Sequence, residues 1–291
     1  MMLRERSFRR SDLLVLVIVV WVLIDMGYLL GGGMLIHDDF HRNLRCQDNL
    51  RRYGSAFAMY LDDHDQIFPD SYYWFYNEEG DRITRDTGSY YCRFHIKALN
   101  PVNHPEWAGS LWRYMPEPNV HICPTFDHLA RSGLGAMHYG HNSSIPVECQ
   151  YTYSMNGYLG GGRFGVVKKL GQIERSAAGI FSFSEENAMW NIRGRSAVSA
   201  VLNSNIITRL RPGDGGTFSG AFATYHMAPS EEIELQMIDG GCFALQSGKE
   251  YPKWGLCRGW GNAVFLDLHV QSMPYHVDTH DYAWPLKLGN R

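Results

Sequence analysis

Residues 13–36 read LLVLVIVVWVLIDMGYLLGGGMLI, and residues 46–69 read CQDNLRRYGSAFAMYLDDHDQIFP. The first stretch is apolar along almost its whole length, and its 24 residues are enough to span a bilayer as a helix. We therefore predict a transmembrane helix over residues 13–36. Residues 1–12 are then a short basic leader, and residues 37–291 are predicted to form a globular domain attached to the helix.

The charges that flank the apolar stretch predict its orientation. The leader carries four arginines, whereas His37, Asp38 and Asp39 follow the stretch. Because positive charge is retained on the cytoplasmic side, we expect a cytoplasmic amino terminus and a periplasmic or surface-exposed domain. A conventional signal peptide is the alternative, although residues 25–28 offer no small-x-small cleavage site. Asp25 is either a functional acid inside the membrane or a residue at its outer interface.

The second stretch has the spacing of an amphipathic helix. Cys46, Leu50, Tyr53 and Phe57 recur every three to four residues, and polar residues fall on the opposite face. We predict one helix from the membrane to about Asp62, with its apolar stripe against a sheet.

The remainder of the chain favours strands over helices. Alternating or apolar runs predict strands near residues 151–158, 179–184, 222–225, 233–238 and 261–267. A short helix is expected over residues 111–115 and an extended piece over residues 120–124. One long helix followed by strands predicts an α+β fold, with the helix on an antiparallel sheet and loop-rich insertions.

Charge and cysteine content narrow the classes of partner and compartment. A net charge of −3 provides no basic field, so nucleic acid is not expected as a partner. The six cysteines form no Cys-x-x-Cys pair, and behind a membrane segment they suggest disulfides formed in an oxidising compartment. Of the fifteen possible connectivities we choose Cys123–Cys149 and Cys242–Cys257, because each closes a modest loop, and this leaves Cys46 with Cys92. Buried free thiols are the alternative.

The leader and four further segments share motifs with a bacterial family. Residues 7–15, SFRRSDLLV, place Ser7 before a new amino-terminal Phe8 and put Asp12 four residues after it. The further segments are 46–69, 121–124 (HICP), 153–160 (YSMNGYLG) and 262–270 (NAVFLDLHV). Together they resemble the type IV pilin-like pseudopilins, in particular the group with a carboxy-terminal histidine and aspartate-glycine signature. Here Leu268 replaces the glycine and Cys257 the histidine.

The resemblance implies a pilin-like fold and a structural, non-catalytic role. Such a subunit sits in the inner membrane, contacts other pilin-like subunits and the secretion or pilus assembly machinery, and is processed by cleavage and methylation. A carboxylate such as Asp12 would neutralise the new ammonium group of Phe8 in an apolar fibre. The family motif positions are Cys46, Asn49, Leu50, Cys123, Pro124, Asn156, Gly157, Asp267 and His269.

Standard catalytic signatures are absent from the sequence, so we expect no enzyme and no cofactor. His138 and His141 are candidate ligands of zinc or copper, although they lie in a glycine-rich loop. Asp62, Asp63 and Asp65 are candidate calcium ligands, and a solvated acidic helix end is the alternative that we prefer. Asp267 and His269, expected on one face of a strand, could form an acid-base pair, but a structural hydrogen bond is preferred.

Two other functions remain open at this point. The aromatic cluster at residues 72–76, with Trp254, Trp260 and Trp284, would suit a membrane-anchored protein that binds polysaccharide, although such aromatics are more often core residues. The second open function is a metal-dependent hydrolase built on the histidines, among them His269, His276 and His280.

Overall fold

In the computed structural model, the described residues are 10–86, 100–131, 150–162, 164–185, 206–207, 222–223, 226, 259–274, 277 and 279–287. Within the helices and strands, the side chains of residues 10–16, 18, 22–37, 84–86, 129–131 and 206 are not described. Several predictions lie outside this description: the processing site Ser7 and Phe8, the side chain of Asp12, the strand at 233–238 and most of the side chains in the predicted span.

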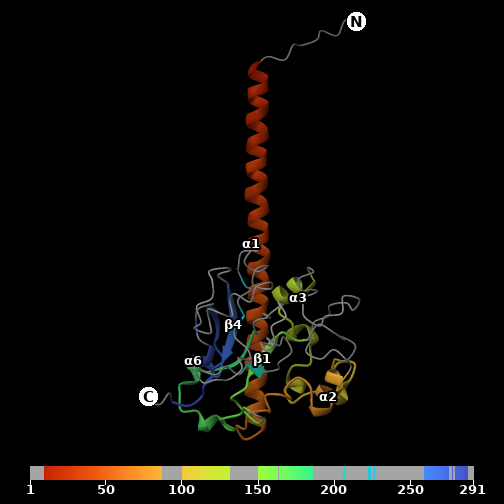
Figure 1. Cartoon of the computed structure of the whole chain (residues 1–291), viewed down its shortest axis with the longest axis vertical. Helices are drawn as coiled ribbons and strands as arrows, with labels where there is room; N and C mark the ends of the chain where they lie inside the picture. Colours follow the sequence, from red (N-terminus) through yellow and green to blue (C-terminus); the bar gives the residue numbers. More distant parts are fainter. Residues whose placement is uncertain are drawn as a thin grey trace, which may run out of the picture. The chain divides into compact units, whose positions relative to one another are not determined.

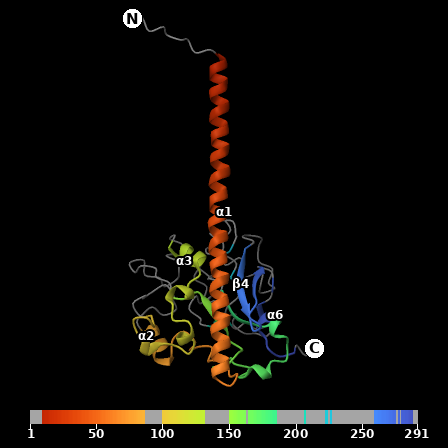
Figure 2. The ribbon, with the colours of Figure 1, turned by 180° about the vertical axis from the view of Figure 1, so that it is seen from behind.

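A single helix, α1 (Arg10–Asp63), opens the described chain, as Figures 1 and 2 show. The predicted end at about Asp62 is therefore confirmed. The chain divides into two compact units, Met1–His41 and Arg42–Arg291, and α1 contributes to both. Among the side chains described in the first unit, five large apolar ones are exposed, namely Val17, Val19, Val20, Trp21 and Phe40. Among the residues that the structure describes, no helix has both the length and the apolar character of a membrane span.

The second unit contains a five-stranded sheet in the order β3-β1-β2-β4-β5. The strands are β1 (Tyr153–Asn156), β2 (Phe181–Glu185), β3 (Ile206–Ile207), β4 (Trp260–Phe265) and β5 (Val270–Pro274). Four of them, β1, β2, β4 and β5, pair antiparallel, and β3 pairs parallel with β1. The α+β fold with a long helix on an antiparallel sheet is thus confirmed. The small helices are α2 (Glu78–Asp86), α3 (Pro124–Arg131) and α6 (Thr279–Ala283).

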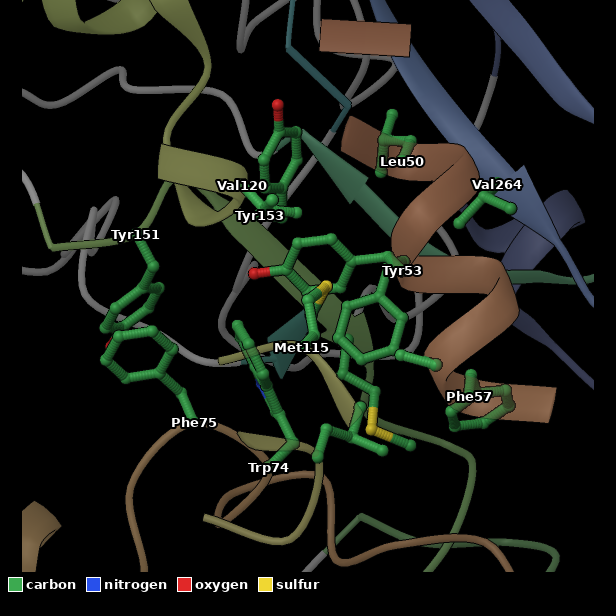
Figure 3. Packing of buried hydrophobic residues seen from close by; sticks show 14 of the residues in the cluster. Leu50, Tyr53, Phe57, Trp74, Phe75, Met115, Val120, Tyr151, Tyr153 and Val264 are labelled. Carbon is green, nitrogen blue, oxygen red and sulfur yellow. The ribbon is translucent and has the colours of Figure 1, made fainter. Parts of the chain in front are cut away.

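The apolar stripe of α1 is buried as its spacing predicts. Leu50 and Tyr53 are fully buried, Phe57 nearly so, and the polar residues between them are exposed. Figure 3 shows these side chains meeting aromatic residues from the sheet and from the segment after α1. A Cβ on Gly54 would lie 2.9 Å from Cγ2 of Val264 in β4. The absence of a side chain at Gly54 therefore lets the helix backbone approach the sheet closely.

The opposite face of the sheet packs against a smaller cluster that includes residues of α6. Phe181 belongs to this cluster, whereas Phe183 belongs to the cluster under α1. Residues two apart in a regular strand share a face, but here the register shifts between them, with Phe181 opposite Phe265 and Phe183 opposite Val264. The irregularity at Ser182 lets β2 bury one phenylalanine on each side.

Some local predictions need correction. The predicted extended piece at 120–124 is only partly extended: a 3-10 turn over Pro118–His121 is followed by the extended Ile122, and α3 begins at Pro124. The strand predicted at 261–267 ends at Phe265, and Asp267 lies in the following turn. The short helix expected at 111–115 is confirmed as a 3-10 turn over Trp112–Tyr114.

The aromatic cluster at residues 72–76 contributes to the core. Trp74, Phe75 and Tyr76 are buried, and Trp74 packs edge-on against Tyr53 of α1. A sugar-stacking surface needs an exposed ring face, which Trp74 does not have.

Candidate functional site: the buried junction of α1 with the sheet

A disulfide between Cys46 of α1 and Cys123, the residue before α3, lies at the centre of the junction. The two Cα atoms are 5.0 Å apart and both cysteines are fully buried. The predicted pairings Cys46–Cys92 and Cys123–Cys149 are therefore wrong, because each uses a cysteine of this bond. Cys92, Cys149, Cys242 and Cys257 lie outside the described residues.

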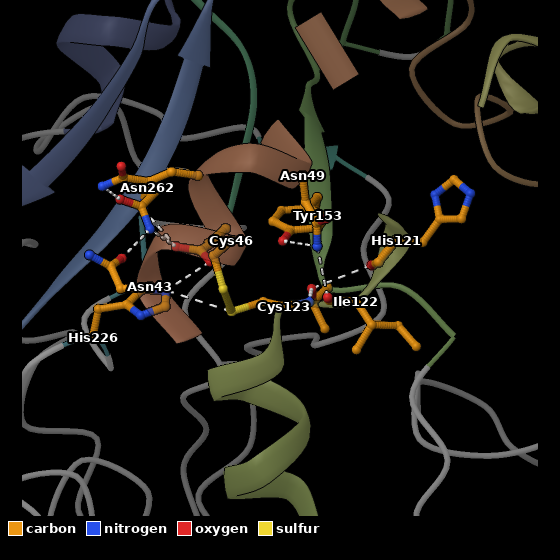
Figure 4. The surroundings of a disulfide bond; sticks show 12 residues. Asn43, Cys46, Asn49, His121, Ile122, Cys123, Tyr153, His226 and Asn262 are labelled. Atoms are coloured by element: carbon orange, nitrogen blue, oxygen red, sulfur yellow. Dashed lines mark hydrogen bonds and ion pairs between the residues drawn. A yellow bond between two sulfur atoms is a disulfide. The ribbon is translucent and has the colours of Figure 1, made fainter. Parts of the chain in front are cut away.

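The polar groups of α1 hold the segment that carries Cys123. The side-chain amide of Asn49 donates to the carbonyl oxygen of Ile122 at 3.0 Å and to the hydroxyl of Tyr153 at 3.2 Å. Figure 4 shows this bridge beside the disulfide. The family motif position Asn49 thus links the helix both to the segment before α3 and to strand β1.

His121 forms a second polar link, and its partners determine its tautomer. Nε2 lies 3.0 Å from the carbonyl oxygen of Met115, which can only accept, so Nε2 carries the proton. Nδ1 then accepts from the hydroxyl of Tyr53 at 2.8 Å. Burial lowers the pKa of His121 from 6.5 to about 3, although the hydrogen bond to Met115 opposes the shift. The imidazole is therefore neutral across the physiological pH range.

On the other side of the disulfide lies a buried acid and imidazole pair. Oε1 of Glu185, the last residue of β2, lies 2.8 Å from Nε2 of His226, and both side chains are fully buried. The same Nε2 lies 3.6 Å from Sγ of Cys123. In the described part of the chain, Cys46, Cys123, Glu185 and His226 form one group of potential metal ligands, whose ligand atoms all lie within 4.8 Å of one another.

Asn262 of β4 fixes the orientation of this acid. Its backbone N–H and its side-chain amide donate to Oε2 of Glu185 at 2.7 and 3.1 Å. The same side-chain amide donates to Oδ1 of Asn43 on α1 at 2.8 Å. Asn262 therefore connects the acid of β2 to the helix, as Figure 4 shows for its contact with Asn43.

The remaining motif residues stabilise the sheet and its turns. Asn156 donates from its side chain to the carbonyl oxygens of Phe181 at 3.0 Å and Ala283 at 2.8 Å, which ties β1 to β2 and α6. Gly157 donates to the carbonyl oxygen of Ile207 at 2.9 Å. Both residues are thus part of the fold's own hydrogen bonding.

Asp267 and His269 meet in the turn between β4 and β5, and not on one face of a strand as predicted. Oδ1 of Asp267 lies 2.5 Å from Nδ1 of His269, so the preferred structural hydrogen bond is present. Partial burial raises the pKa of Asp267, but the hydrogen bonds from His269 outweigh it and leave the pKa lowered. Leu268 between them has φ 74°, the left-handed region that favours glycine.

The carboxylates at the acidic end of α1 contact other side chains and do not converge on one point. Asp62 accepts from the side chain of Gln66 at 3.1 Å, and Asp63 pairs with Arg113 and accepts from the hydroxyl of Tyr114 at 2.8 Å. Asp62, Asp63 and Asp65 are not among the described groups close enough to share an ion. His138, His141 and His276 lie outside the described residues, and His280 is buried against Trp284.

Sequence reasoning missed Glu185, His226 and Asn262. One local signal was present: Glu185 directly follows the alternating Phe-Ser residues of β2, where a buried charge requires a partner. Nothing in the sequence indicated that His226 would supply it from 41 residues away.

The comparisons with known proteins do not extend this picture, because no family model, no curated protein and no solved structure matches the chain.

Proposed function

We propose that the chain is a pseudopilin-like structural subunit of a type II secretion or type IV pilus-like system. Residues 13–36 anchor it in the inner membrane, and residues 37–291 form a periplasmic or surface-exposed domain without catalytic activity. The observation that carries this proposal is α1 (Arg10–Asp63), a helix whose second part forms the core of an α+β domain on an antiparallel sheet. The family motifs contribute to that packing.

The first unit supports the anchor. Val17, Val19, Val20 and Trp21 are 56%, 48%, 46% and 66% exposed. At 100° per residue these positions are distributed around the helix, so apolar side chains cover more than one face. A helix that is apolar all round is typical of a membrane span or of a helix packed among other helices. Lipid provides such surroundings while the protein is anchored in the membrane. Neighbouring subunits provide them in a fibre.

The leader and the residues directly after it would allow the protein to change from a membrane-anchored form to a fibre subunit. Cleavage after Ser7 would create an ammonium group on Phe8, and Asp12 of a neighbouring subunit would neutralise it within an apolar fibre. Arg9 and Arg10 suit the lipid headgroups around an anchored protein.

The second unit supports a structural role through its buried polar groups. The disulfide, the His121 link and the Glu185–His226 pair are all buried, and each joins α1 or β2 to a different segment. Such links hold the helix in one position on the sheet, which a subunit needs if its helix is to pack against identical helices.

The test is the state of the amino terminus in the native membrane. Intact mass and amino-terminal sequencing of the purified protein should show a chain that begins at methylated Phe8, retained in the membrane after alkaline carbonate extraction. Ser7→Gly should increase the cleaved fraction. Asp12→Ala should leave cleavage unchanged and reduce subunit crosslinks.

The possible results separate the parts of the proposal. An intact Met1 terminus in a membrane-retained protein would contradict fibre assembly, whereas the proposed membrane anchor would still stand. Release of the protein by carbonate would contradict the anchor itself.

A further inference from the structure

We infer that Cys46, Cys123, Glu185 and His226 form a site for a zinc-type transition metal ion when their disulfide is reduced. This inference goes beyond the proposed structural role. It begins from the convergence of two sulfurs, one imidazole nitrogen and one carboxylate oxygen within 4.8 Å of one another. The four residues come from four places in the chain, namely α1, the segment before α3, the end of β2 and the bridge that pairs with Trp260.

The ligand types fit a tetrahedral zinc site. Thiolate sulfur, imidazole nitrogen and carboxylate oxygen all bind zinc, at about 2.3 Å for sulfur and about 2.0 to 2.2 Å for the others. Tetrahedral geometry then separates neighbouring ligand atoms by roughly 3.3 to 3.8 Å. The 3.6 Å between Sγ of Cys123 and Nε2 of His226 already lies in that range. Reduction frees the two sulfurs to separate, and the 2.8 Å contact of Glu185 with His226 opens slightly around an ion.

The orientation of the acid and the imidazole is the second part of the argument. Asn262 occupies Oε2 of Glu185 with two hydrogen bonds, so Oε1 is the oxygen that faces His226. Nε2 of His226 faces both Oε1 and Cys123. Hydrogen bonds that fix a ligating carboxylate in this way are typical of metal sites. Both acid and imidazole are fully buried, so water does not compete for these atoms.

Exchange of the disulfide for a metal ion requires a reductant, and a phosphine is sufficient. A phosphine and one water convert the disulfide to two thiols, and the phosphine takes up the oxygen as a phosphine oxide. Binding of one Zn²⁺ by the two sulfurs then releases the two thiol protons to solvent, because the thiolate is the ligand form. The ion replaces the covalent bond, so Cys46 and Cys123 stay linked in both states.

The test uses the full chain in detergent, first oxidised and then reduced with a phosphine. Bound zinc is measured by elemental analysis after desalting, and cobalt is used as a spectroscopic probe. The reduced native chain should bind one zinc equivalent more than a Cys46→Ser, Cys123→Ser double variant, which keeps the other four cysteines. Cobalt should give a thiolate-to-metal charge-transfer band in the reduced native chain and no such band in the double variant. The oxidised native chain should show neither the additional zinc equivalent nor the cobalt band.

Single variants test the other two ligands. Glu185→Gln and His226→Asn should each weaken zinc binding at least ten-fold. Both retain the disulfide before reduction, so their folding is verified in the oxidised form by circular dichroism. Glu174→Gln and His64→Asn, at exposed and half-exposed positions outside the cluster, are matched controls and should bind as the native chain does.

Two results would overturn the site. The first is a reduced native chain that binds no more zinc than the double variant. This result would show that the two sulfurs are not ligands. The second is unchanged affinity in both Glu185→Gln and His226→Asn, which would show that the thiolates act without them. If a variant fails to fold, the bound zinc of the native chain can still be compared between its oxidised and its reduced form.

Discussion

The hydroxyl of Tyr53 donates to Nδ1 of His121, and the opposite nitrogen of the same ring donates to the carbonyl oxygen of Met115. These two bonds fix the tautomer of the imidazole, and its burial keeps it neutral inside the core. Its pKa is lowered from 6.5 to about 3, so between these values the unfolded chain binds a proton that the folded chain does not. The contribution of His121 to stability is therefore complete above pH 6.5 and is lost as the pH falls toward 3.

His121→Gln should remove this pH dependence. Glutamine offers an N–H to Met115 and an oxygen to Tyr53 but does not titrate. At neutral pH we expect the variant to lose about 1 to 2 kcal/mol of unfolding free energy, because the ring also stacks on Trp112. Between pH 6 and pH 4 its stability should fall less steeply than that of the native chain, by up to about 1.4 kcal/mol per pH unit. Urea unfolding at several pH values measures this, and equal slopes would contradict the neutral assignment. His64→Gln is the control.

The disulfide should stabilise the second unit through the loop that it closes. Cys46 and Cys123 are 77 positions apart. The loop-entropy relation gives about 4.5 kcal/mol for a loop of that length, in the absence of native strain. Cys46→Ser with Cys123→Ser should lower the free energy of unfolding by this order in a metal-free buffer. Denaturant titration checks the value, and a loss below about 1 kcal/mol would show that the unfolded chain is not restrained by this bond.

Leu268→Gly should stabilise the turn between β4 and β5. Leucine at φ 74° is strained, and glycine adopts this conformation freely. Relief of the strain exceeds the extra chain entropy that glycine carries in the unfolded state, so we expect a gain of about 0.5 to 1 kcal/mol. Leu268→Ala removes the side chain but keeps the strain, and it should show no gain. A melting temperature unchanged by the glycine would contradict the argument.

Phe183→Ala should destabilise the core under α1. The ring is fully buried and lies 4.8 Å from Tyr53 and 5.1 Å from Trp74, centroid to centroid. Loss of a buried phenylalanine costs about 3 to 5 kcal/mol. The matched change Phe164→Ala, at a side chain that is 38% exposed, should cost about 0.5 kcal/mol or less. Chemical denaturation of both variants tests this, and similar losses would contradict the assigned packing.

The helix and its buried face were predictable because a 3.6-residue period is local. Leu50, Tyr53 and Phe57 repeat at that period, so their common face follows from spacing alone. The α+β class followed in the same way, from the order of one long helix and several strands.

The faces of β2 were not predictable by the same logic. Strict alternation puts Phe181 and Phe183 on one side, whereas the shift at Ser182 places them on opposite sides. This irregularity depends on pairing with β4, about 80 residues later, and leaves no local signal.

The buried junction was predictable only in part. Asn49, Cys46 and Cys123 were identified by motif, but the partners of the cysteines were wrong because pairing depends on tertiary contacts that spacing does not encode. His226 and Asn262 were missed because they acquire a role only when Glu185 is buried between them.

The bond between Cys46 and Cys123 also determines how the second unit responds to mechanical force. A pull applied at the amino end of α1 reaches Cys46 before it reaches Leu50, Tyr53 or Phe57, and the covalent bond transfers it directly to Cys123. The 76 residues between the cysteines are then mechanically shielded, and extension must come from outside the loop. Reduction would remove this clamp, so single-molecule extension of the reduced, metal-free chain would release the additional contour length of the loop.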